Sequence, residues 1–208
     1  MQPLFTPTIT KYEAIGKQPS KEGVFSTGIP PITHLEEPKN NTILIYAGTG
    51  NFNINLDFCM NLNQALRKAG LSSYYVMQKT YPKAVISMAL NDGIETVIGI
   101  CTTRNNSVPG LNGQEIFTTS RKSYLLGTYI AEAIASNELI RAFPKVQNEP
   151  SNSPSWTAAR SGLTLVRISL GYLSNYYDAD LIVNHKEELS RLMAQGIGKY
   201  QGEGAILQ

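Results

Sequence analysis

The chain of 208 residues is 42% hydrophobic and 16% charged, and its formal net charge at pH 7 is +2. These values are typical of a folded globular protein, and the length suits one domain that buries a sizeable core. The basic residues form no run longer than Arg121-Lys122, so the charge pattern gives no reason to expect a nucleic-acid-binding surface.

Residues 1–41 contain scattered Pro and Gly and show no period typical of a strand or a helix. We interpret them as an extended arm that orders by contact with another protein subunit or, alternatively, covers an edge of its own sheet. The start of the arm lacks the features of a signal peptide, and no apolar run approaches the roughly 18 residues of a membrane span. We therefore expect a protein of the cytoplasm, or of a particle assembled there.

From Thr42 onward, apolar strands alternate with amphipathic helices. The strands are expected at 42–48, 74–79, 95–101, 114–119 and 163–169. The helices are expected at about 54–69, after Pro82, at about 120–137 and from the N-cap residue Asn184 onward. Two stretches rich in turn formers, 102–113 and 147–155, are predicted as loops. This pattern predicts one α/β domain over 42–208, with a mostly parallel twisted sheet and helices on both faces.

The turn "AGTGN" follows the first predicted strand, in the place of a phosphate-binding loop. It contains Gly48 and Gly50, but it lacks the third Gly of a dinucleotide fingerprint and the Lys-Ser/Thr pair of a P-loop. We interpret it as a tight strand-to-helix turn that needs small residues, and we expect no nucleotide or other cofactor.

The chain has only two histidines, His34 and His185, which limits the metal or base chemistry that can be proposed. Cys59 and Cys101 are too few for a disulfide framework, and we interpret them as buried free thiols. Cys101 ends the third predicted strand, where it could serve as a nucleophile if a His lay nearby and lowered its pKa. The pattern does not place His34 or His185 there, so this alternative stays open.

Two tyrosine pairs, "SSYYV" and "NYYDAD", could stack on a sugar or another ring. The alternative interpretation is that these tyrosines are amphipathic surface or half-buried packing residues. Asp178 and Asp180 form a loose acidic pair in a predicted loop, and we interpret them as helix-start or turn formers rather than an acid/base pair.

Ser169 closes the fifth predicted strand, just before a Gly turn, where an α/β enzyme often presents a catalytic group. The segment from this strand to Tyr200 resembles the zinc-dependent N-acetylmuramoyl-L-alanine amidases that cleave peptidoglycan. Their last strand reads V-x-V-E-x-G-F-x-S-N, followed by D-x-x-x-L and a helix ending in A-I-x-x-G-I-x-x-Y. The matching residues here are Val166, Ile168, Ser169, Gly171, Tyr172, Ser174, Asn175, Asp178, Leu181, Gly196, Ile197 and Tyr200.

Shorter segments, "ILIYAGTGN", "LNQALRKAG", "VIGICTTRN" and "GLNGQEIF", are similar to family segments in the same order, so the resemblance covers about 42–201. In the family, two His and one Glu hold a zinc ion, and a Glu on the last strand activates water. The motifs place Thr49, Asn51, Cys101 and Ser169 at these four positions. Of these, only Cys101 is a good zinc ligand, and Ser cannot act as a general base near pH 7. The resemblance therefore implies a degenerate site that binds no metal.

We accordingly expect a catalytically inactive amidase-like domain that acts as a binding or structural module. Its partner would be cell-wall peptidoglycan, or other protein subunits of a bacterial or phage assembly contacted through residues 1–41. The alternative is an active amidase or other hydrolase with a rearranged site, using Cys101 with a displaced His185 or Asp57.

Overall fold

The computed structural model describes residues 41–103, 113–138, 140, 142–150 and 152–204. The predicted arm, apart from Asn41, lies outside these residues, as do residues 104–112 of the first predicted loop. The described strands are β1 (Ile43–Ala47), β2 (Ser73–Val76), β3 (Thr96–Thr103), β4 (Glu115–Thr118), β5 (Lys145–Asn148) and β6 (Thr164–Tyr172). The described helices are α1 (Phe52–Lys68), α2 (Pro82–Asn91), α3 (Arg121–Ala135), α4 (Trp156–Arg160), α5 (Tyr176–Asn184) and α6 (Lys186–Gly204).

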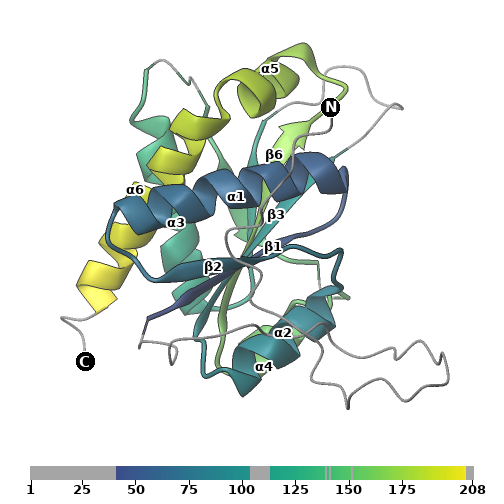
Figure 1. The fold of residues 1–208 in the computed structure, drawn as a ribbon, viewed down its shortest axis with the longest axis vertical. Helices are drawn as coiled ribbons and strands as arrows, with labels where there is room; N and C mark the ends of the chain where they lie inside the picture. The colour runs from purple at the N-terminus through teal and green to yellow at the C-terminus, as the bar shows by residue number, and fades with distance from the viewer. Residues whose placement is uncertain (1–40, 104–112, 139, 141, 151, 205–208) are drawn as a thin grey trace, which may run out of the picture.

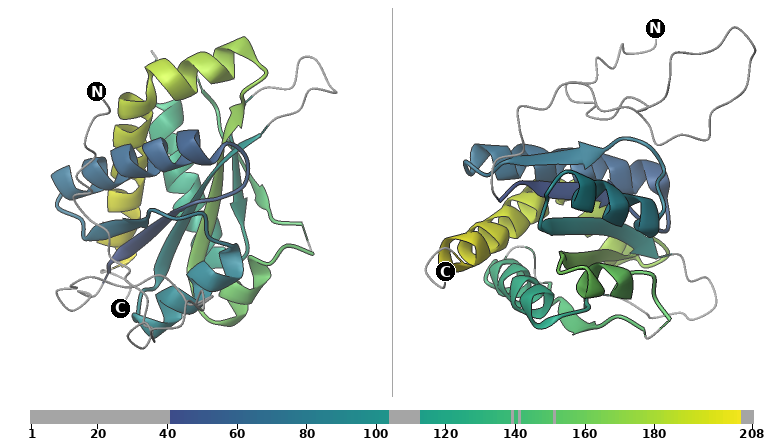
Figure 2. Two further views of the ribbon diagram at one scale, coloured as in Figure 1. Left: turned by 45° about the vertical axis from the view of Figure 1, so that its right-hand side comes forward. Right: turned by 90° about the horizontal axis from the view of Figure 1, so that it is seen from below.

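The described strands form one sheet in the order β2-β1-β3-β6-β4-β5. Every pairing is parallel except that of β4 with β6, which is antiparallel. Helices α1, α3 and α6 cover one face of the sheet, and α2 and α4 cover part of the other (Figures 1 and 2). The predicted α/β domain, with a mostly parallel sheet between two helical layers, is therefore confirmed.

The core consists of two apolar clusters, one on each side of the sheet. Strand β1 supplies both, because its side chains alternate: Ile43 and Ile45 pack with α1, α3 and α6, whereas Leu44 and Tyr46 pack with α2 and α4. Burial on both faces explains why this strand reads as a continuous apolar run in the sequence. No helix among the described residues is long and apolar enough to cross a membrane.

The segment predicted as the loop 147–155 differs from expectation. Its first residues belong to β5, and α4 follows directly after it. Glu149, which falls within this predicted loop, is only 3% exposed because it pairs with Arg167 of β6. The sequence does not indicate strand β5, because this strand has no alternation of apolar and polar residues. It lies at the edge of the sheet, where its ends are exposed and its central residues are half-buried.

Three details of the C-terminal third differ from expectation. The predicted loop after the last strand is helix α5, and Asn175, not Asn184, caps the start of helical structure by accepting hydrogen bonds from the N–H groups of Tyr177 and Asp178. The last helix does start near Asn184, as predicted, since α6 begins at Lys186, but Asn184 is the last residue of α5 and not the N-cap of α6. Ser169 does not end β6, because the strand continues through Gly171 to Tyr172, which pairs with Thr103.

Candidate functional site

The four positions named from the sequence lie toward the carboxyl ends of β1, β3 and β6. Cys101 of β3 and Ser169 of β6 are directly paired across the two strands. The Thr49 carbonyl accepts a hydrogen bond from the Thr102 N–H at 3.1 Å, and the Asn51 N–H donates to Thr102 Oγ1 at 2.9 Å. All four residues therefore lie at the carboxyl-terminal side of the central strands.

The turn between β1 and α1 is held by bonds to the rest of the domain. The Gly48 N–H donates to the Ile100 carbonyl at 2.7 Å, and Asn55 Nδ2 donates to the carbonyls of Gly48 and Thr49 at 3.3 and 2.9 Å. A Cβ atom on Gly50, whose φ is +105°, would lie 1.9 Å from the Thr102 carbonyl oxygen. These contacts agree with the interpretation of "AGTGN" as a tight turn that needs small residues.

Asn51 and Thr49 differ in what their side chains do. The Asn51 side chain accepts a hydrogen bond from the Ile54 N–H at 3.3 Å and so caps α1. Thr49 is exposed. The Asn51 amide oxygen therefore satisfies a helix N–H group that would otherwise lack a partner.

Cys101 and Ser169 are buried, at 2% and 4% exposure. The Cys101 Sγ atom lies beneath Gly48, so close that a Cβ atom on this glycine would stand 2.5 Å from it. Ser169 Oγ lies 3.3 Å from Thr103 Oγ1. The other thiol, Cys59, is also free and buried, and burial raises its pKa well above the ordinary value. The prediction of two buried free thiols is confirmed.

The structure adds a carboxylate that the sequence reasoning missed. Glu115 of β4 is paired directly with Ser169, on the side of β6 opposite Cys101. It is half-buried and accepts a hydrogen bond from Gln147 Nε2 at 3.0 Å. Burial raises the pKa of Tyr172, and the nearby carboxylates of Glu115 and Asp178 raise it further. Only the antiparallel pairing of β4 with β6 brings Glu115 to this place, and no local sequence signal reports that pairing.

An ion pair lies on the same face of β6, two residues before Ser169. Arg167 binds Glu149 through two hydrogen bonds, Nε to Oε1 at 2.6 Å and Nη2 to Oε2 at 2.9 Å. Its guanidinium carbon lies 4.5 Å from the centre of the Phe117 ring. Burial lowers the pKa of Arg167, but its hydrogen bonds to Glu149 and the charges of Cys101, Glu149 and Tyr46 together raise this pKa above its ordinary value. The pair ties the segment after β5 to the strand that carries Ser169.

The residues considered for a rearranged site, His185 and Asp57, make their contacts among the helices. Asp57 forms an ion pair with Lys186 at the start of α6, and His185 Nε2 lies 3.7 Å from Asp180 Oδ2 of α5. Within the part of the chain that the structure describes, no three His, Cys, Asp or Glu residues lie close enough to hold a metal ion.

The tyrosine pairs and the acidic pair fall in different surroundings. Tyr74 and Tyr75 are buried in β2, which confirms the packing interpretation for this pair. Tyr176 and Tyr177 are highly exposed on α5. Asp178 lies in the first turn of α5, as a helix-start former should, whereas the expectation that it and Asp180 lie in a loop is wrong.

No protein-family model matches this chain, and no curated protein matches it in sequence. Its fold is similar to that of N-acetylmuramoyl-L-alanine amidases. AmiC2 of Nostoc punctiforme has a TM-score of 0.65 and 13% identity, covering 78% of this chain and 98% of that chain. The catalytic domain of CwlV from Bacillus (Paenibacillus) polymyxa has a TM-score of 0.59 and 16% identity, covering 81% and 99%.

The N-acetylmuramoyl-L-alanine amidase from Clostridium difficile 630 has a TM-score of 0.59 and 18% identity, covering 79% of this chain and 96% of that chain. At such identities the similarity establishes the fold alone. The chain thus contains an almost complete amidase-type α/β domain, as its sequence resemblance predicts.

Proposed function

We propose that this chain is a catalytically inactive amidase-fold domain that binds peptidoglycan. The observation that carries the proposal is the chemistry at the strand ends. Thr49, Asn51 and Ser169 offer hydroxyl and amide groups where zinc takes His, Cys or carboxylate ligands. The Asn51 amide oxygen already caps α1, and Cys101 is buried beneath Gly48. The residues at these positions therefore do not fit a catalytic zinc ion.

The choice of ligand rests on the relatives of the fold. The similar solved structures are N-acetylmuramoyl-L-alanine amidases, which are named for the bond between a muramoyl sugar and L-alanine. A domain that keeps this architecture without the residues for hydrolysis can still bind the glycan and its peptide. Retained binding without turnover is the function that this combination supports best.

A second candidate is a hydrolase that uses Cys101 as its nucleophile, and it depends on a base near this thiol. Glu115 is paired with Ser169, which in turn is paired with Cys101, so a carboxylate lies two strands away from the thiol. A nucleophilic thiol needs a base within hydrogen-bond reach to become a thiolate. The one described His, His185, lies beside Asp180 on the helical layer. The inactive binding domain is therefore preferred.

Metal analysis and digestion of peptidoglycan test the proposal together. We expect the purified full chain to contain far less than one zinc ion per molecule by elemental analysis. We expect no release of peptide from purified peptidoglycan, with or without added zinc, because no three described His, Cys, Asp or Glu residues lie close enough to hold a metal ion. One zinc per chain that survives mild chelation would contradict the proposal. Turnover that is lost in both Cys101→Ala and Glu115→Gln would establish the second candidate instead.

We also propose that residues 1–41 form an arm that binds another protein subunit in an assembly. The arm contains more apolar and aromatic residues than a polar linker, namely Leu4, Phe5, Ile9, Tyr12, Phe25, Ile29, Ile32 and Leu35. Ordering such a segment costs about 1–2 kcal/mol of backbone entropy per residue, which contact with a partner surface can offset.

Deletion of residues 1–38 tests this role of the arm. We expect the truncated chain to keep its folded domain, measured by circular dichroism, and to lose its assembled state, measured by light scattering after gel filtration. A full-length chain that is already monomeric contradicts self-assembly. If instead the size is unchanged and the melting temperature falls, the arm covers an edge of its own sheet and the assembly proposal is wrong.

A further inference from the structure

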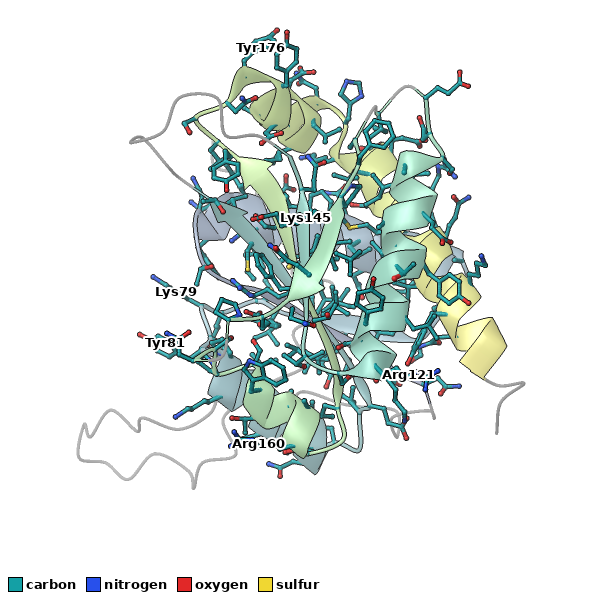
Figure 3. All side chains as sticks on the ribbon, turned by 180° about the vertical axis from the view of Figure 1, so that it is seen from behind. Lys79, Tyr81, Arg121, Lys145, Arg160 and Tyr176 are labelled. Carbon is teal, nitrogen blue, oxygen red and sulfur yellow. The ribbon has the colours of Figure 1, made fainter. Side chains whose placement is uncertain are left out.

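The N-terminal turn of α5 presents two large aromatic side chains to solvent. Tyr176 is 79% exposed and Tyr177 is 77% exposed, although large apolar and aromatic side chains usually gain by burial. Their rings are 5.8 Å apart and inclined at 77°, so one ring presents its edge to the other. Figure 3 shows Tyr176 projecting from the end of the molecule, far from Tyr81.

This turn of α5 is anchored firmly beneath the tyrosines. The buried carboxylate of Asp178 accepts hydrogen bonds from the Tyr172 N–H at 2.8 Å and from the Gly113 N–H at 3.0 and 3.1 Å. Asn175 caps the helix through the N–H groups of its first turn. The aromatic pair is therefore presented on a fixed support at the carboxyl end of β6, and binding would not have to order the backbone.

Polar groups continue along α5 from the aromatic pair. Asp180 and Asn184 follow Tyr176 at intervals of four residues and so lie on the same side of the helix. Asn184 Nδ2 donates to Asp180 Oδ1 at 2.6 Å, and His185 Nε2 lies 3.7 Å from Asp180 Oδ2. Asp180 and His185 are exposed, with 41% and 48% of their side chains accessible to solvent. We call the surface formed by Tyr176, Tyr177, Asp180, Asn184 and His185 the α5 stripe.

The far end of the α5 stripe opens into a hollow. Asn184 and His185 line a depression of about 1030 Å³ between α1 and the start of α6, together with Gln64, Lys68 and Glu187. Asn184 lies eight positions after Tyr176, which corresponds to about 12 Å along a helix. A linear ligand can therefore begin at the tyrosines and end in the hollow.

We propose that the α5 stripe binds the sugar rings of a glycan strand. An aromatic face stacks on the C–H face of a pyranose, and a carboxylate beside an amide accepts and donates hydrogen bonds to neighbouring hydroxyl groups. A protein partner fits less well, because a stable interface takes about 800 Å² from each side, whereas two aromatic side chains supply about 300–500 Å². The proposal rests on the proposed function for the identity of the glycan. It places the glycan-binding surface on α5 and not at the carboxyl ends of the strands.

Binding of the full chain to two probes tests this proposal. The first probe is purified insoluble peptidoglycan, and the second is a soluble oligosaccharide of N-acetylglucosamine that carries no peptide. We expect the wild type to bind both, and the double variant Tyr176→Ala/Tyr177→Ala to bind both at least about tenfold more weakly, since exposed aromatic anchors dominate such sites. Tyr176→Phe/Tyr177→Phe should keep most of the affinity, because it keeps both rings.

Tyr81→Ala is the matched control, because Tyr81 is also 79% exposed but lies at the start of α2, where its side chain makes no capping bond. This variant should bind like the wild type. Unchanged binding by the double alanine variant, folded by circular dichroism, overturns the α5 stripe while peptidoglycan binding by the domain stands. Binding to peptidoglycan but not to the peptide-free oligosaccharide also overturns it. If the wild type binds neither probe, the proposed function fails as well.

Discussion

Replacement of Glu149 by alanine is expected to lower the free energy of unfolding by about 3–5 kcal/mol. The Glu149 side chain is fully buried, and it is the partner of the largely buried guanidinium of Arg167. Removing the carboxylate leaves this charge without its two hydrogen bonds, in a place where water cannot fully replace them. Ser155 Oγ, which donates to Glu149 Oε1 at 3.3 Å, loses its partner too. Unfolding in urea, followed by circular dichroism, measures the loss.

Arg191→Ala is the control for this prediction. Arg191 binds Glu188 through two hydrogen bonds of similar length, but both side chains are partly exposed, at 49% and 33%. Exposed pairs contribute about 0–1 kcal/mol, so this variant should unfold almost like the wild type. Replacing both buried partners by apolar residues, Glu149→Leu with Arg167→Met, should recover part of the loss. A loss below about 1 kcal/mol for Glu149→Ala would contradict the expectation.

The expected loss bears on the candidate site because Arg167 lies two residues before Ser169 on one face of β6. The ion pair joins β6 to the segment after β5, across the intervening strand β4. Strand β4 carries Glu115 and β5 carries Gln147, which are bonded to each other. The pair therefore helps to hold these side chains beside Ser169.

The sequence predicts best where one local pattern decides the structure. Strands β1 and β3 are buried on both faces, so each reads as an unbroken apolar run. Helix α1 has apolar residues on one side, a capping Asn51 and a glycine after its end, and its predicted start agrees with the structure to within two residues. The same local signals indicated the tight turn that brings Thr49 and Asn51 to the sheet edge.

Prediction failed where contacts distant in the sequence decide the structure. Glu149 lies in a segment rich in Pro and Ser, and only its pairing with Arg167 explains its burial. Glu115 lies beside Ser169 because β4 runs antiparallel to β6, whereas the sequence pattern predicts a mostly parallel sheet. The sequence does not indicate helix α5, because its amphipathic pattern is weak and a buried Asp178 rather than an apolar side chain anchors its first turn.

Gly50→Ala is expected to lower the free energy of unfolding by about 3–5 kcal/mol, more than most single substitutions. The backbone of Gly50 has a φ of +105°, which L-residues adopt only at a cost. A methyl group there would lie 1.9 Å from the carbonyl oxygen and 2.5 Å from the side-chain oxygen of Thr102. Strand β3 or the turn must therefore shift, which breaks the bonds from Asn51 and Thr102 that close the site.

Gly70→Ala separates the cost of a positive φ from the cost of the close contact with Thr102. Gly70 also has a positive φ, of +80°, but a Cβ atom there would meet nothing within 4 Å. For this variant, the free energy of unfolding should fall only by the cost of placing an L-residue at a positive φ, which is about 1–2 kcal/mol. Urea unfolding of both variants measures the difference, which reports the contact between the turn and Thr102. Equal losses for the two glycines would mean that the turn moves away from β3 freely. In that case Thr49 and Asn51 are not held at fixed positions beside Cys101.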